Sequence, residues 1–415
     1  MWGPMNADGT RGGGSTLAAV DPGQARTRVG LRAVLGQWFH GEHGVAPIVV
    51  GLAFVWVVLA VIQPDFLSAE NLVNLTLQSV PVGVIALGVV LVLLVGQIDL
   101  SVGSVSGLAA AIVAVGTVTA GWPFVLAVAV ALACGMAVGL VYGILSSRLG
   151  LPSFVITLAG LLFLAGLQLR VLGPLGSINL PFESWFVRSI QQGFLDPAVA
   201  WALVVLWVLA YLAMQVWGRE RRRRADLACA PWSQVVLRTG ALAAVLGAAV
   251  GYLSTARGVG YSVVLFVVLV IVADVALRRT RWGRSVRAVG SDRRAALLSG
   301  VAVHRTVVSS FVACSTLAAL GGVLAAGRLG AANQGTGGAD TYLTAIAAAV
   351  IGGTSLFGGR GSAWSALLGV LVIQSVANGL TLLDLDQATR YMVTGAVLLG
   401  AIVVDMLVRR RRQEA

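Results

Sequence analysis

The sequence contains no lysine, so all 29 of its basic residues are arginine. This absence matters for the glycine-rich stretch at 351–362, which resembles a phosphate-binding loop. Such a loop needs a lysine that reaches the phosphates, and a nucleotide site there is therefore excluded. A glycine-rich break between two apolar stretches instead predicts a helix interrupted inside a membrane, where irregular backbone is tolerated only against protein or a water-filled path.

Cysteine and histidine are also scarce, with three residues of each. Cys134 and Cys314 lie inside apolar stretches and Cys229 follows an arginine run, so neither a disulfide framework nor a CxxC metal pattern is present. The histidines are too scattered along the chain to form a metal site. We therefore expect no cofactor, no bound metal and no catalytic residue.

Charged residues make up only 11% of the chain, whereas an ordinary soluble domain carries about 25%. With 58% hydrophobic residues and a mean hydropathy of +0.89, the composition predicts an all-α polytopic membrane protein. A formal charge of +12 could suggest a nucleic-acid partner. The arginines lie in short blocks between apolar stretches, however, which indicates membrane topology and a lipid environment instead.

Apolar runs long enough to span about 30 Å of hydrocarbon occur about twelve times. The sequence thus predicts about twelve transmembrane segments, some of them broken by glycine-rich stretches. Whether the short run at 340–356 crosses or re-enters is open. The predicted segments lie at about 46–63, 71–95, 98–120, 123–146, 153–172, 199–217, 235–255, 259–277, 306–328, 340–356, 361–381 and 389–408.

Arginine blocks at 219–224, 278–305 and 409–412 each follow an even-numbered segment. Because arginine collects in cytoplasmic loops, we expect both termini in the cytoplasm, and parity favours a crossing at 340–356. The predicted organisation therefore has three parts. They are a cytoplasmic N-terminal tail at 1–45, a transmembrane permease domain at 46–408 with a cytoplasmic loop at 278–305, and a basic cytoplasmic tail at 409–415.

The loop at 278–305 contains a capped helix in our interpretation. Ser291 or Asp292 provides an N-cap for a helix that starts at about Arg293, and Gly300 provides the left-handed residue that ends it. A helix of two turns is marginal alone. We therefore expect it to pack on the neighbouring segments or on a partner protein.

Asp99 lies in a second glycine-containing break, between two strongly apolar segments. An acid inside a membrane is a candidate functional residue by default. The alternative is that its carboxylate caps a helix that starts near Leu100, which is compatible with lining a path together with Ser101.

Neutral polar side chains accompany both breaks. Asn71, Asn74 and Gln78 share one face of a predicted helix, where they could line a transport path or join helices by hydrogen bonds. The second half of the chain has a similar set, and paired glycine-interrupted segments are typical of a transport path between repeats. The candidates for such a path are Asn71, Asn74, Gln78, Asp99, Ser101, Asn333, Thr354, Ser355 and Asn378.

Three stretches carry a family resemblance. They run from Phe66-Leu-Ser through Asn71, Asn74 and Gly88 to Ile98-Asp-Leu-Ser-Val-Gly-Ser104, from Gly290 through Ala295-Ala296 to Ser299-Gly300-Val301, and over Ile351-Gly-Gly-Thr-Ser-Leu-Phe-Gly-Gly-Arg-Gly-Ser362. In these stretches, and over about 46–408 in general, the chain resembles the permease subunits of bacterial monosaccharide ABC importers. It is most similar to the xylose-type members, because of the extra segment after 219–224 and the stretch at 378–384.

The resemblance implies a permease in the bacterial cytoplasmic membrane that imports xylose or a similar sugar by alternating access. It also implies a second permease copy, an extracytoplasmic sugar-binding protein and a cytosolic ABC ATPase as partners. On this analogy the helix at about 291–299 is a coupling helix that docks into the ATPase. The candidate coupling residues are Arg284, Gly290, Ala295, Ala296 and Gly300.

Two other function classes are less well supported by the residues. An ion-coupled secondary transporter would use buried ionisable groups, for which Asp99, Arg170 and Asp274 are the candidates. An integral membrane enzyme would need clustered acids, bases or metal ligands, and the sequence has no such cluster. The identity of the sugar is not encoded in any residue that we can single out.

Overall fold

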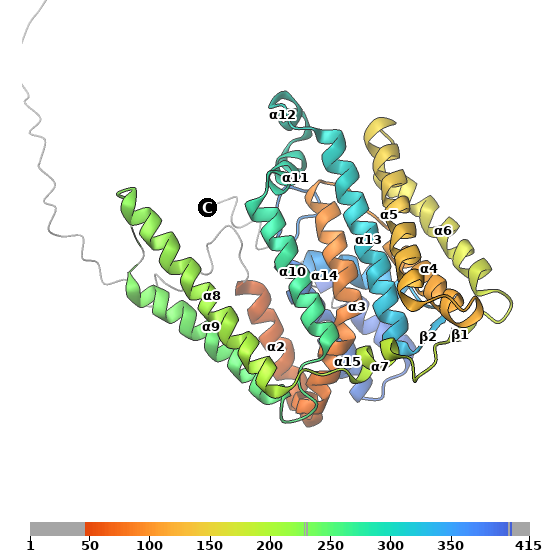
Figure 1. Cartoon of the computed structure of the whole chain (residues 1–415), viewed down its shortest axis with the longest axis horizontal. Helices are drawn as coiled ribbons and strands as arrows, with labels where there is room; N and C mark the ends of the chain where they lie inside the picture. Colours follow the sequence, from red (N-terminus) through yellow and green to blue (C-terminus); the bar gives the residue numbers. More distant parts are fainter. Residues whose placement is uncertain (1–45, 228, 230, 397–398, 401–415) are drawn as a thin grey trace, which may run out of the picture. The chain divides into compact units, whose positions relative to one another are not determined.

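The computed structural model describes residues 46–227, 229, 231–396 and 399–400. In these residues the chain forms packed α-helices and one short β-ribbon (Figure 1). The predicted tail at 1–45 and the basic tail at 409–415 lie outside the described residues.

The helices differ widely in length, and two of them are preceded or followed by a short turn of another helix type. In chain order the elements are α2 (Ala46–Ile62), the 3₁₀-helix η1 (Pro64–Leu67), α3 (Ala69–Leu94), α4 (Val102–Ala114), the π-helix η2 (Val115–Thr119), α5 (Phe124–Arg148), α6 (Ser153–Leu172), β1 (Ser177–Asn179), α7 (Trp185–Gln192), α8 (Pro197–Arg224), α9 (Trp232–Leu253), α10 (Tyr261–Arg279), α11 (Arg281–Ser291), α12 (Arg293–Leu298), α13 (Val303–Leu329), β2 (Ala331–Asn333), α14 (Ala339–Ile351) and α15 (Trp364–Leu382).

The all-α, multi-pass prediction is confirmed. In the described part of the chain, nine helices are long and apolar enough to cross a membrane, and α2 and α14 are shorter apolar helices. The predicted segment at 389–408 begins with helical residues 387–396, and its last residues lie outside the described part. Asp386 caps its start: hydrogen bonds from the hydroxyl and amide of Thr389 (2.6 and 2.9 Å) lower the pKa of the Asp386 carboxyl.

Helices α3 and α13 form the centre of the packing. Of the most apolar stretch of α3, 89% is buried inside the protein, compared with only 6% of that of α8. Helix α13 packs against α3, α4 and α5, whereas α8 and α9 form a hairpin that packs mainly on itself (Figure 1). The exposed apolar side chains of this hairpin suit a lipid environment.

Successive helices alternate in direction, so several helix ends lie together. The C-terminal ends of α3, α5 and α10 lie at the same end of the packed helices as α11 and α12 (Figure 1). We call this the α12 end. At the opposite end, β1 and β2 pair antiparallel, with Ser177 opposite Asn333.

Glycines permit the close approach of the central helices. A Cβ atom added to Gly322 of α13 would lie 1.9 Å from the carbonyl oxygen of Ser106 in α4, and one added to Gly88 of α3 would lie 2.7 Å from that of Cys314. Because apolar lipid gives no hydrophobic force between helices, such close packing carries much of their association.

We expect Gly322→Ala to destabilise the protein by about 1–3 kcal/mol, because α4 and α13 must separate to admit the methyl group. Gly166→Ala is the matched control, since a Cβ atom at this helical glycine meets nothing within 4 Å. Thermal unfolding in detergent measures both. A melting temperature of the Gly322 variant equal to that of the control would refute the close contact.

Candidate functional site

Asp99 lies in a non-helical segment, residues 95–101, between α3 and α4. Its side chain is only 1% exposed. Its Oδ1 atom accepts hydrogen bonds from the backbone amide (2.8 Å) and the hydroxyl (2.7 Å) of Ser101, and Cys314 Sγ lies 3.9 Å from Oδ2. Because Cys314 lies near the middle of α13, this carboxyl is deep inside the packed helices.

The structure corrects the capping alternative for Asp99. Helix α4 begins at Val102 and not near Leu100, and Ser101 occupies the N-cap position without a side-chain capping bond. The carboxyl of Asp99 therefore orders the turn that leads into α4 and does not cap the helix itself. Its position beside a transport path stays a prediction.

Side chains from α6 satisfy backbone amides of this segment, and one from α5 binds a side chain of the segment. Ser153 Oγ and Thr157 Oγ1 of α6 accept hydrogen bonds from the amides of Ile98 and Leu100, both at 3.1 Å. Ser146 of α5 donates a hydrogen bond to the side chain of Gln97 at 3.0 Å. Irregular backbone persists at membrane depth only where protein provides such partners. The sequence analysis missed these residues, although the spacing of four between Ser153 and Thr157 in an apolar helix was a usable signal.

A second non-helical segment, residues 334–338, lies directly before α14. Gln168 of α6 donates hydrogen bonds to the carbonyl oxygens of Asn333 (3.0 Å) and Thr336 (2.9 Å). The side chain of Asn333 stays within this turn, where its Oδ1 atom accepts a hydrogen bond from the amide of Gly335 (2.9 Å).

The second non-helical segment packs against α4. A Cβ atom added to Gly103 would lie 2.6 Å from the carbonyl oxygen of Gly337, and one added to Gly107 would lie 2.2 Å from that of Thr336. The segment from the second half of the sequence therefore contacts the first two turns of the helix that follows the Asp99 segment. The Asp99 segment itself contacts the glycine-rich stretch at 351–362, since a Cβ atom added to Gly358 would lie 2.9 Å from the Cα atom of Gly96. The sequence analysis represented 334–338 only by Asn333.

The glycine-rich stretch at 351–362 joins α14 to α15 at the α12 end. The amide of Gly359 donates a hydrogen bond to Leu94 O, the last carbonyl of α3, at 3.0 Å. A Cβ atom added to Gly290 of α11 would lie 1.8 Å from the same carbonyl oxygen, and one added to Gly358 would lie 2.7 Å from Gly290 O. Gly358 and Gly359 also have positive φ values of 90° and 73°. We call Leu94, Gly290, Gly358 and Gly359 the glycine junction.

Two further path candidates of the C-terminal half, Thr354 and Ser355, are buried within the protein. Thr354 is 0% and Ser355 is 7% exposed. The Oγ atom of Ser355 accepts a hydrogen bond from the amide of Phe357 at 3.2 Å, so it shapes the loop. Gly290, predicted as a coupling residue, lies in the glycine junction and not on the exposed surface of α12.

Asn71 and Asn378 form a reciprocal pair of hydrogen bonds between α3 and α15. Each amide nitrogen donates to the other side chain's oxygen, at 2.8 and 3.0 Å, and both side chains are buried. Asn74 accepts a hydrogen bond from Arg257, and the carbonyl oxygen of Gln78 accepts one from Gln374 (3.2 Å). For Asn71 and Asn378 the contacts favour the helix-joining alternative over path lining.

The capped helix in the loop between α10 and α13 is present as predicted. Helix α12 begins at Arg293, and Asp292 Oδ1 accepts hydrogen bonds from the amides of Arg294 (2.8 Å) and Ala295 (2.9 Å). Gly300 ends this region with a φ value of 78°. The N-cap is thus Asp292, one of the two residues proposed from the sequence.

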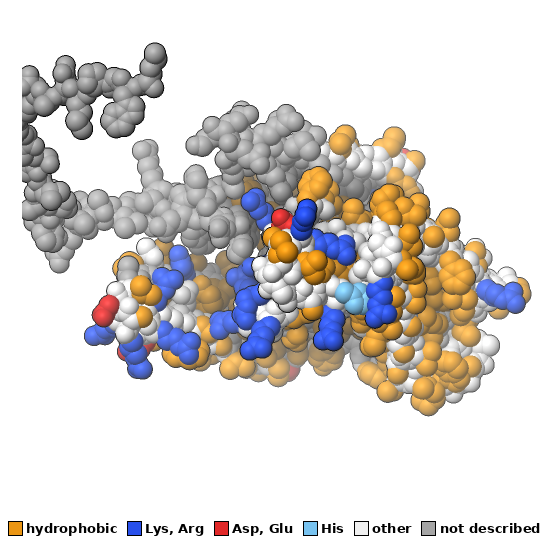
Figure 2. Space-filling view, turned by 90° about the horizontal axis from the view of Figure 1, so that it is seen from above, with side chains coloured by type: hydrophobic (Ala, Val, Ile, Leu, Met, Phe, Trp, Pro, Cys, Tyr) orange, Lys and Arg blue, Asp and Glu red, His pale blue; other side chains and the backbone are white. Residues whose placement is uncertain are grey.

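Helix α12 exposes two apolar side chains that the sequence analysis did not single out. Leu297 is 63% and Leu298 is 82% exposed. Ala295 is exposed beside them, while Ala296 faces the protein interior, and Arg284 of α11 is also exposed. Basic side chains are spread over this face of the protein (Figure 2). The α12 end therefore presents exposed leucines within a positively charged surface.

Comparison with known proteins agrees with this architecture. Residues 71–402 match the model of the family described as the permease component of the branched-chain amino acid transport system. The chain belongs to this permease family. The permease is 34% identical, over 88% of its own length and 91% of the relative's, to the xylose transport system permease protein XylH of Escherichia coli K12.

Two further relatives are similar over most of their length. The permease is 34% identical to the XylH protein of Haemophilus influenzae, over 82% of its own chain and 90% of that protein. It is 30% identical to the ribose import permease protein RbsC of Bacillus subtilis, over 86% and 91% of the two chains. No solved structure matches the permease. The predicted resemblance to permease subunits is confirmed, and the chain is a multi-pass membrane transport protein and not an enzyme.

We expect Asp99→Asn to fold with little loss of stability, because an amide oxygen still accepts both hydrogen bonds from Ser101. Asp99→Leu removes the acceptor and leaves a buried amide unpaired, which costs about 1–3 kcal/mol. Thermal unfolding of the two variants in detergent checks this difference. Equal melting temperatures for the two variants would mean that the Ser101 contacts do not hold this segment.

Proposed function

We propose that the permease is the membrane subunit of an ABC importer that moves xylose or a similar monosaccharide across the bacterial cytoplasmic membrane by alternating access. A cytosolic ABC ATPase drives it, and an extracytoplasmic sugar-binding protein delivers the sugar. The similarity to xylose permeases over most of the chain supports the substrate class. The structural observation that supports coupling to the ATPase is the exposure of Leu297 and Leu298 on α12.

Helix α12 has the properties of a docking element. It is only six residues long, so it is marginal by itself. The capping bonds of Asp292 and a backbone hydrogen bond from Val301 to Ala296 (3.0 Å) hold it in shape. An ordered helix that exposes Leu297 and Leu298 provides a preformed apolar contact for the ATPase.

The glycine junction connects this docking element to the interior. Helix α11 leads directly into α12, and its Gly290 contacts the end of α3. Helix α3 continues into the segment that holds Asp99. Movement of α12 on the ATPase would therefore reach both the Asp99 segment and the loop at 351–362 through backbone contacts, with no flexible side chain between them.

Orientation and assembly belong to the same proposal. The arginine-rich α12 end faces the cytoplasm, because arginine collects in cytoplasmic loops, and both termini lie on that side. The permease works as a homodimer in this proposal, as the resemblance to ABC permeases implies. The segments 95–101 and 334–338 and the glycine-rich stretch at 351–362 then lie on the route between the binding protein and the cytoplasm.

An ion-coupled secondary transporter receives less support. Asp274 forms an ion pair with Arg278 at 2.8 Å near the α12 end of α10, and Arg170 is exposed on α6. Of the three ionisable candidates, only Asp99 is buried deep among the helices. A single carboxyl fixed by Ser101 is a weak basis for ion coupling.

Reconstitution in liposomes tests the proposed function. We expect the permease alone to show no uptake of labelled xylose under a proton or sodium gradient. Addition of the ATPase, the sugar-binding protein and ATP on the correct sides should produce uptake. Gradient-driven uptake by the permease alone would refute the ABC mechanism.

We expect Leu298→Glu or Ala295→Glu to weaken ATPase binding at least about tenfold, the change that 1.4 kcal/mol produces, and to abolish ATP-driven uptake. Leu227→Glu is the control, because Leu227 is a 61% exposed leucine in the α8–α9 connection. Pull-down of the ATPase and membrane insertion are measured together. Unchanged binding in both α12 variants would remove α12 as the docking element.

A further inference from the structure

An open groove of about 530 Å³ runs between α5 and α13 near the α12 end. Leu140 and Ile144 of α5 line it on one side, and Val308, Val312 and Ala313 of α13 line it on the other. None of the residues used so far for the transport path lies in it. The groove is therefore a feature that the proposed function leaves unexplained.

One end of the groove is charged and the other is apolar. Leu140, Ile144 and Arg148 are spaced four residues apart on α5, so the groove follows that helix for about 12 Å. Arg148 is the last residue of α5, and Arg305 lies in the first turn of α13. The arginines thus lie at the helix ends, where lipid headgroups are, and the apolar lining extends into the depth of the membrane.

His304 fixes the position of one arginine. Arg148 Nε donates a hydrogen bond to His304 Nε2 at 3.1 Å, so the imidazole proton is on Nδ1. Nδ1 donates to the hydroxyl of Ser147, which donates to the carbonyl oxygen of Gly143. This hydrogen bond uses only Nε of Arg148, so within the described residues its terminal N–H groups remain available for an anion.

No acidic residue of the described ranges forms an ion pair with these two arginines. Neither α5 nor α13 contains an aspartate or a glutamate. In the described part of the chain, the two ion pairs involve Arg224 and Arg278, and neither Arg148 nor Arg305. Two uncompensated guanidinium groups above an apolar groove match a negatively charged head attached to a hydrocarbon chain.

We propose that this groove binds one anionic phospholipid. Arg148 and Arg305 hold its phosphate, and one acyl chain lies along Leu140, Ile144 and Val312. Trp282 donates a hydrogen bond to Ser309 of the groove lining at 2.8 Å, and tryptophan is favoured at this membrane depth. The proposal depends on the membrane-spanning fold alone and not on the sugar or on the ATPase.

A lipid fits better than a protein partner. A cytosolic protein can contact the arginines, but it cannot follow the groove into the hydrocarbon layer. A second permease copy would bring the same basic helices and no acidic residue of α5 or α13 to pair with them. An acyl chain with a phosphate head satisfies both ends of the groove.

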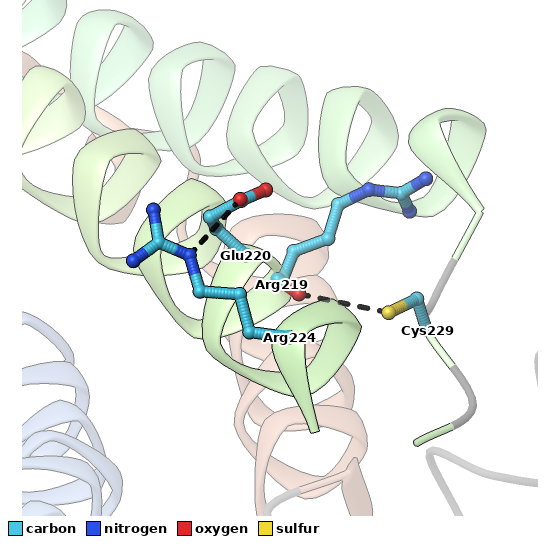
Figure 3. Close-up of polar contacts among 4 residues, drawn as sticks. All are labelled: Arg219, Glu220, Arg224 and Cys229. Carbon is cyan, nitrogen blue, oxygen red and sulfur yellow. Dashed lines mark hydrogen bonds and ion pairs between the residues drawn. The ribbon is translucent and has the colours of Figure 1, made fainter. Parts of the chain in front are cut away.

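The tip of the α8–α9 hairpin provides a contrasting basic cluster (Figure 3). Glu220 forms an ion pair with Arg224 at 3.3 Å. The thiol of Cys229 donates a weak hydrogen bond to the carbonyl oxygen of Arg219, with Sγ and O 3.6 Å apart. Arg222 and Arg223 are exposed there and are absent from the lining of the α5–α13 groove. This cluster is positively charged, as a site for a lipid headgroup would be, but it does not line the α5–α13 groove. It therefore serves as the control.

Native mass spectrometry of the full-length permease tests the proposal, after equilibration with vesicles of phosphatidylcholine and phosphatidylglycerol. We expect one phosphatidylglycerol to stay bound, and Arg148→Gln/Arg305→Gln to lower its retention at least about tenfold. Ala313→Phe fills the groove without a change in charge and should lower retention similarly. Arg222→Gln/Arg223→Gln should leave retention unchanged, and melting temperatures show whether each variant is folded.

Several outcomes would overturn the lipid site. Equal retention in the groove variants, or an equal loss in the hairpin control, would mean that lipid binds to basic surface in general. Displacement of phosphatidylglycerol by free glycerol 3-phosphate would show that the acyl groove contributes nothing. Loss of ATPase binding with unchanged lipid retention in Arg148→Gln/Arg305→Gln would assign these arginines to the ATPase instead.

Discussion

The structure depends on one constraint, that every backbone polar group inside the hydrocarbon layer needs a partner from the protein. The chain breaks its helices at 95–101 and 334–338, and both breaks are stabilised from the same helix. Ser153, Thr157 and Gln168 of α6 provide the hydrogen bonds that helical neighbours would otherwise supply. Helix α6 therefore holds two irregular segments in place. Its few polar residues provide these hydrogen bonds, although most of its surface is apolar and exposed.

Close backbone packing follows from the same environment. Where helices gain no hydrophobic force from contact with one another, glycine lets backbones approach and pack. Gly322 lets α13 reach α4, and Gly290 lets α11 reach the last carbonyl of α3. The loop at 351–362 resembles a phosphate-binding loop, but in the glycine junction its backbone packs against the end of α3 and against α11. The proposed energy source is ATP bound to another subunit, and α12 is the proposed contact with it.

The lipid environment also explains exposed apolar surfaces that would be unfavourable in a soluble protein. The α8–α9 hairpin exposes apolar side chains along most of its length. The α5–α13 groove combines an apolar floor with two arginines that form no ion pair with any residue that the structure describes. Both features match the layered chemistry of a bilayer, in which hydrocarbon lies beneath charged headgroups. The proposed phospholipid would bridge α5 and α13 beside the end of the loop that carries α12, where α13 begins.

The sequence by itself determined the class of protein, most helix positions and the two candidates for the α12 N-cap, because hydrophobic runs and local capping depend on neighbouring residues along the chain. It also located Asp99 and the glycine-rich breaks. Tertiary structure alone decided what these residues contact: that Asn71 pairs with Asn378, that Asp99 orders Ser101 and not a helix end, and that Gly290 meets Leu94. Such contacts join residues up to 307 positions apart, and periodicity and capping rules carry no information over that separation.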